Sequence, residues 1–516
     1  MTTDSDPTIA LPGVAEPPPL PPPPVPPPQR LRALNLGPAL SFVAIGFCLG
    51  LAALWQMAGL DWTASAATWL DRSAHHGPLA EDGLVALAWH HAARLGLNLA
   101  QAISLWQFLT AGTLLAALLL VAWRLRGPVA GLLALGLLLL WPTSRALVVT
   151  VGAETPLAAL LLLQILAGLL AWPRPLLSAI LLGTSLALLI LVHPLGLPLA
   201  VASLLAVLVL PLRRGVEPLP GVEPRAGLWP HPVVVPQLAG LALGAGLLAA
   251  ALGPGGFKTH WLHLLGEWRA PVVTPWLGGL ANLPVLGTFV ALVGQMPVPL
   301  LVLAISAIVG AVRRPKDFTA LPAGVLVACV IALCWIGLPA PGLIDGVALL
   351  APGIVLLAVV MIVDVARELW ARGNAGARTA GVVLALATLL AFLADVQIGE
   401  RDRRNLIAHI PGVMTTTAGI QPAILHADDL GLLARQPQPT SILPSHPGGD
   451  ALANALRRLH PVLAGVSFGA PFSADRVLVS RAPPPSVDEM WTHLGKPEGC
   501  SASARTCLYG IRVKPQ

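Results

Sequence analysis

Charge is scarce in this sequence: aspartate, glutamate, lysine and arginine make up only 11% of the 516 residues, whereas 55% are hydrophobic. This composition excludes a soluble protein of such length, which would need a more polar surface. Uncharged apolar runs recur along the chain, and many approach the roughly 20 residues that a membrane-spanning helix requires. The alternation typical of membrane β-barrel strands is missing. We therefore predict an all-α polytopic membrane protein.

Two further absences exclude particular partners and sites. The net charge is +6, but the sequence has no basic patch interleaved with aromatic residues, so we expect no nucleic-acid partner. The arginines occupy short loops between apolar runs, as in membrane proteins that set their orientation by charge. The five cysteines form no metal-binding motif. Cys500 and Cys507, in the polar tail, are candidates for a disulfide if that tail lies outside the cytosol.

About eleven apolar segments are predicted to cross the membrane. Loops rich in arginine alternate with loops that carry carboxylates and histidines, and one topology satisfies this pattern. It places the N-terminus in the cytosol and the C-terminus outside, in the periplasm. The expected membrane is the inner (plasma) membrane of a bacterium. The uncharged stretch 270–312 is long enough for two crossings. We predict one crossing, because Arg313 then lies in the cytosol. The predicted spans are 37–60, 101–123, 128–142, 156–172, 175–192, 195–212, 233–252, one within 270–312, 318–338, 346–363 and 379–394.

The two ends of the chain differ from the transmembrane domain, which we assign to residues 36–397. We expect that the N-terminus is not a signal peptide, and residues 1–35 contain a nearly continuous proline run at 17–28. This run predicts a disordered, extended cytosolic tail, with a docking site for a proline-reading partner as the alternative. Residues 398–516 are polar, with short β-like runs at 476–480 and 507–513. They predict a small α/β extramembrane domain.

The densest group of ionisable residues lies between the first two predicted spans. Asp61 follows directly on the first span, at headgroup level, where desolvation can turn a carboxylate into a usable general base. Glu81 and Asp82 are further catalytic candidates in the same outer loop. A solvated acidic loop is the alternative for all three. We expect interfacial helices within this loop, at 61–100.

Part of that loop predicts one particular interfacial helix. Residues 81–99 carry an apolar pattern at Leu84, Leu87, Ala88 and Leu95. The pattern is broken by His90, His91 and Arg94, of which His90 and Arg94 lie one helical turn apart. The polar face of such a helix could hold an anionic lipid headgroup. Interfacial packing is the alternative for the two histidines.

Further candidates flank the middle spans. Arg145 and Glu154 border a short outer segment, where an acid at a helix start and an arginine at a helix end are the structural alternative. His193 closes a pair of apolar spans, as a functional side chain or as a hydrogen-bonded helix breaker. An amphipathic outer helix within 253–284 carries Lys258, His260 and Arg269. Its cations could neutralise a phosphate, and its aromatic residues could anchor it at the interface.

The order of these features resembles the GT-C class of membrane glycosyltransferases, in particular the protein O-mannosyltransferase and aminoarabinose-transferase branch. The similar features are the acid after the first span (Asp61), the outer loop behind it, the run 151–156 that opens the fourth span, and Leu182-Gly183 followed by 191–196. The resemblance covers residues 37–212 well. The family often has two adjacent acids after the first span, whereas here Trp62 follows Asp61.

The resemblance implies transfer of a sugar from a polyprenyl-phosphate-linked donor to a lipid, glycan or protein acceptor at the outer face. A single displacement would invert the anomeric centre. We expect no cofactor, with a divalent metal as the alternative, and membrane lipids as partners. A transporter or flippase is the competing function, although no internal repeat is visible. The expected roles are catalysis by Asp61, Glu81 and Asp82, phosphate binding by Arg94, Arg145, Lys258 and Arg269, and support by His90, His91, Glu154, His193 and His260.

Overall fold

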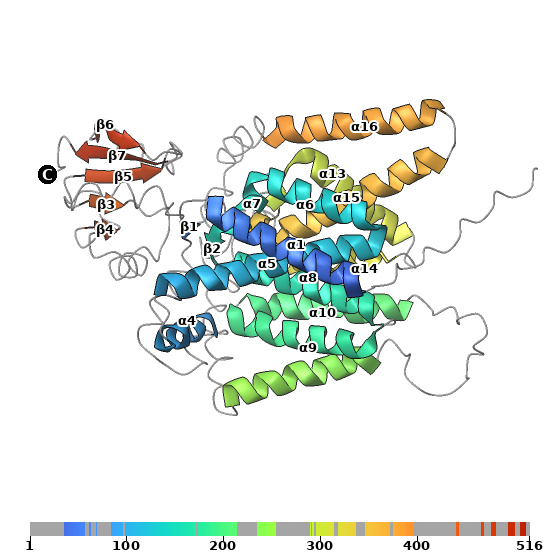
Figure 1. The fold of residues 1–516 in the computed structure, drawn as a ribbon, viewed down its shortest axis with the longest axis horizontal. Coiled ribbons are helices and arrows are strands. Elements are labelled where there is room, and N and C mark those ends of the chain that lie inside the picture. The colour runs from blue at the N-terminus through green and yellow to red at the C-terminus, as the bar shows by residue number, and fades with distance from the viewer. Residues whose placement is uncertain are drawn as a thin grey trace, which may run out of the picture. The chain divides into compact units, whose positions relative to one another are not determined.

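The computed structural model of the chain describes a set of helices, a two-stranded sheet and a five-stranded sheet (Figure 1). The predicted tail 1–35 and the predicted outer helix within 253–284 lie outside the described residues. The described residues are 36–56, 61–62, 69, 84–95, 99–171, 174–193, 195–213, 235–253, 289, 292–293, 296–313, 318–336, 346–371, 375–396, 440–442, 466–468, 476–480, 494–500 and 506–511.

An apolar helix overlaps each of the predicted spans. Among the described residues, five helices are long and apolar enough to cross a membrane, and α6 and α7 form one further candidate that is bent by 95°. The predicted span 128–142 corresponds to α6, and the bend lies at its end, before α7. The helices are α1 (Leu36–Gln56), α4 (Leu84–Arg94), α5 (Leu99–Arg126), α6 (Pro128–Leu140), α7 (Pro142–Val149), α8 (Glu154–Leu170), α9 (Pro175–Val192), α10 (Gly196–Arg213), Val235–Gly253, α13 (Val298–Arg313), α14 (Ala320–Ile336), α15 (Gly346–Ala371) and α16 (Ala375–Ala394).

Small residues let α1 and α5 pack closely in antiparallel orientation (Figure 1). The ring centroids of Phe42 and Trp123 are 5.1 Å apart, and Gly46 faces Ala116. A Cβ atom at Gly46 would lie 2.6 Å from the backbone nitrogen of Ala116. The hydrophobic effect does not drive helices together in lipid. Their association depends instead on close packing of this kind. The end of α1 therefore lies beside the beginning of α5.

Replacing Gly46 with alanine should loosen this contact. The added methyl group would overlap backbone atoms, which cannot rotate away, so we expect a loss of about 1–3 kcal/mol in stability. Thermal unfolding of the purified protein in detergent measures the effect. Gly37→Ala is the matched control on the same helix, because a methyl group added there would have no atom within 4 Å. Equal melting temperatures for the two variants would contradict the close approach.

Polar side chains join helices inside the apolar bundle. The hydroxyl of Ser203 on α10 donates to Gln164 Oε1 on α8, and Ser178 Oγ on α9 donates to the carbonyl of Ala167 on α8 at 2.7 Å. Gln237 Nε2 donates to the carbonyl of Val207 at 2.9 Å. Hydrogen bonds of this kind fix which helices are neighbours in an apolar surrounding.

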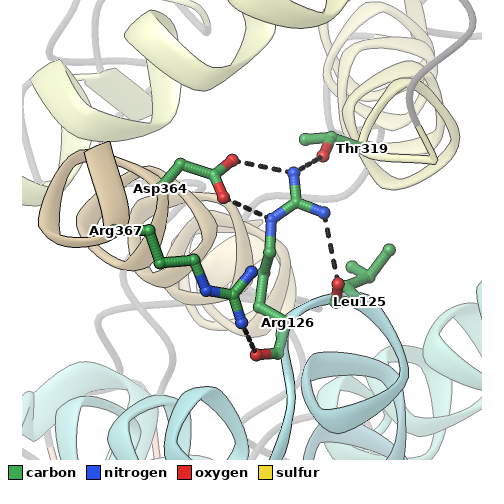
Figure 2. Close-up of polar contacts among 5 residues, drawn as sticks. All are labelled: Leu125, Arg126, Thr319, Asp364 and Arg367. Atoms are coloured by element: carbon green, nitrogen blue, oxygen red, sulfur yellow. Dashed lines mark hydrogen bonds and ion pairs between the residues drawn. The ribbon is translucent and has the colours of Figure 1, made fainter. Parts of the chain in front are cut away.

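An arginine network defines one end of the bundle, where α5 stops and Gly127, with φ 97°, turns the chain into α6. Arg126 Nε and Nη2 donate to the two carboxylate oxygens of Asp364 at 2.6 and 2.7 Å. Nη2 also donates to Thr319 Oγ1, just before α14, at 2.9 Å. Arg367 donates to the carbonyl of Arg126 (Figure 2). We call this the Arg126 end, and the opposite one, where α1 stops and α5 begins, the Asp61 end.

The described part of the C-terminal region forms a mixed five-stranded sheet. Its strand order is β4-β3-β5-β7-β6, in which β3 is parallel to β4 and β5, and β7 is antiparallel to β5 and β6. The predicted β run at 476–480 is confirmed, and that at 507–513 overlaps β7. The strands are β3 (Thr440–Ile442), β4 (Val466–Phe468), β5 (Arg476–Ser480), β6 (Leu494–Cys500) and β7 (Thr506–Ile511).

The register of β6 and β7 bears on the predicted disulfide, because Cys500 and Cys507 are direct cross-strand partners. Opposed positions in antiparallel strands have Cα separations of about 4.5–5.5 Å, within the range that a disulfide spans. We expect non-reducing digestion and mass spectrometry of protein from an oxidising compartment to yield one peptide pair linked through these cysteines. Complete alkylation of both thiols without a reductant would contradict the disulfide. Cys48, a free exposed cysteine in α1, is the internal control.

Candidate functional site

The site forms where two segments far apart in the chain pair at the Asp61 end. Strand β1 (Asp61–Trp62) lies parallel to β2 (Thr150–Val151), with Asp61 opposite Thr150 and Trp62 opposite Val151. Two of the clusters predicted from the sequence, the acid after the first span and the run that opens α8, are therefore side by side. The Thr150 hydroxyl is buried and has no hydrogen-bond partner among the described residues.

A buried glutamine holds the segment before β2 in place. Gln107, on α5 and fully buried, donates through Nε2 to the carbonyls of Leu147 and Val148 at 3.0 and 2.9 Å. The Thr155 hydroxyl, on α8, also donates to Leu147. These bonds satisfy carbonyls at the end of α7 that the helix itself leaves without partners. They fix the short turn from α7 through β2 into α8.

Glu154 is the first residue of α8, and its side chain is buried, with 5% exposed. A carboxylate at this position interacts favourably with the helix N-terminus, which carries a partial positive charge. This is the structural alternative that the sequence leaves open for Glu154, beside a supporting role in the site. The backbone of Asp61 pairs with Thr150, four residues before Glu154, so two acidic residues belong to the same end of the bundle.

His193 follows α9 and is also buried, with 7% exposed. Its Nδ1 accepts a hydrogen bond from the Leu195 backbone nitrogen at 3.1 Å, so the ring proton of the neutral form lies on Nε2. The turn requires Gly196, because a Cβ there would lie 1.6 Å from the carbonyl oxygen of Leu189. Since α8 and α9 are consecutive packed helices joined by a short turn, His193 and Glu154 lie at the same end.

A helix, α4, lies where the sequence predicts an interfacial one, and its side toward the rest of the protein is formed by other residues than the predicted apolar positions. Val85, Ala86 and Trp89 are buried, and the ring of Trp69 meets that of Trp89 edge-on at 6.0 Å. The predicted apolar positions 84, 87 and 88 are only half-buried, and Leu95 is 86% exposed. The predicted apolar positions are therefore not covered by the protein, as a side turned toward lipid requires, and the interfacial location of α4 stays a prediction.

Four basic candidates of the outer loops are described. Arg94 and His91 are exposed on α4, and His90 is half-buried beside His91, with their rings 5.8 Å apart. Arg145 is exposed on α7, the helix that leads into β2. Exposed guanidinium groups remain available to an anion.

Five candidates lie outside the described residues: Glu81, Asp82, Lys258, His260 and Arg269. Within the described ranges, no group of three histidine, cysteine, aspartate or glutamate side chains could hold a metal ion. The Asp61 side chain is likewise not described, and its role rests on the position of its backbone.

The sequence reasoning missed Gln107, Thr150 and Thr155. A signal for Gln107 was present, since a glutamine within a predicted span must find hydrogen-bond partners inside the bundle. The pairing of β1 with β2 had no sequence signal, because two-residue strands leave no periodic pattern.

Comparison with known proteins gives similar structures but no sequence family. No protein-family model matches the chain, and no curated protein is similar to it in sequence. Among solved structures, the chain is similar to ArnT from Cupriavidus metallidurans bound to undecaprenyl phosphate, with a TM-score of 0.39 and 15% identity. It is also similar to ArnT from the same organism in the apo state, with a TM-score of 0.37 and 15% identity. Both alignments cover 93% of this chain and 99% of the other.

Proposed function

We propose that the chain is a membrane glycosyltransferase that transfers a sugar from a polyprenyl-phosphate-linked donor to an acceptor at the outer face of a bacterial inner membrane. The observation that carries the proposal is the pairing of Asp61 with Thr150, which joins the acid after the first span to the segment that opens α8. The motifs that resemble the GT-C class are those two segments, and they meet at one end of an apolar helical bundle.

In the proposed mechanism, the reaction needs a general base, cationic groups beside the lipid phosphate, and an acceptor held in position. Asp61 takes the proton of the acceptor hydroxyl as that oxygen attacks the anomeric carbon. The bond to the lipid phosphate breaks, and negative charge develops on the leaving phosphate, where arginine side chains stabilise it. The exposed side chains of Arg94 and Arg145 are the described candidates for this role. The single displacement inverts the anomeric centre.

Buried groups behind Asp61 have a positioning role in the proposal. Gln107 and Thr155 hold the turn that carries Thr150, and Glu154 stabilises the first turn of α8. A rigid support of this kind keeps the reacting groups within the small tolerance that catalysis allows. The membrane interface supplies the donor, whose polyprenyl chain remains in lipid.

Transport of a lipid-linked or polar substrate is the alternative function, and the 95° bend between α6 and α7 favours it. Broken helices in transporters expose backbone groups to a substrate. Here the carbonyls of Leu147 and Val148, beyond the bend, are already bonded to Gln107. Those groups are therefore not available to a passing substrate, which favours the enzyme.

One experiment separates the two functions. The purified full-length protein is placed in phospholipid vesicles with a polyprenyl phosphate that carries a radiolabelled sugar, together with envelope lipid, glycan or peptide fractions. We expect the label to move to one fraction and free polyprenyl phosphate to appear in equal amount. Label that crosses the bilayer while still attached to polyprenyl phosphate would contradict the transferase and support a flippase.

A further inference from the structure

The Arg126 end contains a second buried arginine whose charge is not compensated. Arg124 is 3% exposed, and its Nε and Nη1 atoms are buried without a hydrogen-bond partner in the described part of the chain. Arg126, two residues further along α5, has a carboxylate, a hydroxyl and a carbonyl as acceptors. A buried guanidinium with unused donors destabilises the fold unless an acceptor is supplied from outside. The contrast between these neighbours singles out Arg124 as a buried cation with unused hydrogen-bond donors.

A second cation lies close to the first. Arg174 precedes α9, at the turn after α8, and its charge acts on that of Arg124. Helix α8 packs against both α5 and α9, which explains why the charges of residues 50 positions apart act on each other. Two arginines that repel each other make the uncompensated charge more costly. An anion between them would offset both the burial of Arg124 and the repulsion.

The position of the pair favours an anion at the membrane surface. Arg124 lies near the end of an apolar helix that is long enough to span a membrane, where lipid headgroups begin. Leu176, two residues after Arg174, is 74% exposed and offers an apolar surface to an acyl chain. Arginine is the side chain best suited to phosphate, because its planar donors match phosphate oxygens.

We propose that Arg124 and Arg174 bind the phosphate group of an anionic phospholipid at the Arg126 end of the bundle. This site lies at the opposite end of α5 from Asp61 and is separate from the proposed donor site. Helix α5 has 28 residues, so at 1.5 Å per residue the two ends are about 40 Å apart. The lipid would stabilise the packing of α5 against α8 and α9 rather than take part in transfer.

The test measures stability and binding in the delipidated full-length protein. Phosphatidylglycerol in mixed micelles should raise the melting temperature saturably, and phosphatidylcholine, which has no net charge, should not. Inorganic phosphate is a parallel arm that distinguishes the source of the group: a rise with phosphate alone, lost on mutation of Arg124, supports the same site with a free anion. No saturable rise with either phosphate source would overturn the proposal.

Variants connect the effect to the two arginines. Arg124→Gln and Arg174→Gln should each weaken phosphatidylglycerol binding by about tenfold to a hundredfold, as expected for the loss of hydrogen bonds to a charged group. Arg313→Gln is the matched control, because Arg313 ends α13 and is exposed. Unchanged binding in Arg124→Gln, or an equal loss in the Arg313 control, would overturn the proposal.

A second variant covers the case in which Arg124→Gln fails to fold. Arg124→Met keeps the length of the side chain and removes the buried charge, so the lipid-free protein should melt at a higher temperature than the wild type. The same variant should show no further rise with phosphatidylglycerol. A retained lipid-dependent rise in Arg124→Met would show that the arginine does not bind the lipid.

Discussion

Replacing Asp61 with asparagine is expected to lower the initial rate of sugar transfer by about 10² to 10⁴-fold, the usual contribution of a general base. Asparagine has nearly the same shape but cannot accept the acceptor's proton at neutral pH. The protein should still be inserted and folded, because β1 pairs with β2 through backbone groups that the change leaves in place. The rate is measured in vesicles at saturating donor, together with the melting temperature.

The matched control for Asp61→Asn is Asp395→Asn. Asp395 follows α16, and its Oδ2 accepts a hydrogen bond from the Val298 backbone nitrogen at 2.8 Å. Asparagine retains an oxygen for that bond, so transfer should be unchanged. Full activity of Asp61→Asn would remove the base from the mechanism, whereas equal loss in both variants would point to a general effect of aspartate replacement.

Replacing Asp364 with alanine should destabilise the protein by about 3 kcal/mol, because the change leaves the guanidinium of Arg126 buried without its carboxylate. Arg126 is 2% exposed, so water cannot replace the lost partner, whereas Asp364 is 32% exposed, which sets the effect at the low end of the range for buried pairs. Unfolding in mixed micelles with increasing denaturing detergent measures the change. The exposed Glu368, on the same helix, gives the control variant Glu368→Ala.

A double variant tests whether the lost charge pairing is the cause. Arg126→Met with Asp364→Leu removes both charges and fills the space with apolar atoms, and it should regain most of the stability lost in Asp364→Ala. A double variant as unstable as the single one would contradict this explanation. It would then assign the effect to the remaining bonds of the network, between Arg126 and Thr319 and between Arg367 and the Arg126 carbonyl.

The helices were predictable from the sequence because their ends carry local signals. The predicted span 175–192 has the bounds of α9, since Pro175 suits the first position of a helix and Pro194 follows its end. The predicted span 346–363 ends too early, and α15 continues to Ala371. Charged residues after Val363 suggested a loop, but Asp364 and Arg367 are bound by Arg126 and keep the helix regular.

The contacts between distant segments could not be predicted in the same way. Arg126 and Asp364 are 238 positions apart, and nothing near either residue specifies the other. The sequence placed Asp61 and the run around Glu154 on one side of the membrane by counting crossings. It had no means of predicting that β1 pairs with β2, because that contact depends on how α1, α5 and α7 pack.

The adjacency of these two segments is tested most directly by cross-linking. In a cysteine-free background, Trp62→Cys and Val151→Cys occupy partner positions of β1 and β2 and should join rapidly through a short thiol-reactive cross-linker. The pair Trp62→Cys with Val129→Cys is the control, because Val129 begins α6 at the Arg126 end. A fast cross-link in the first pair alone is the expected result. No cross-link in the first pair, or an equal yield in both, would contradict a site built where Asp61 meets the start of α8.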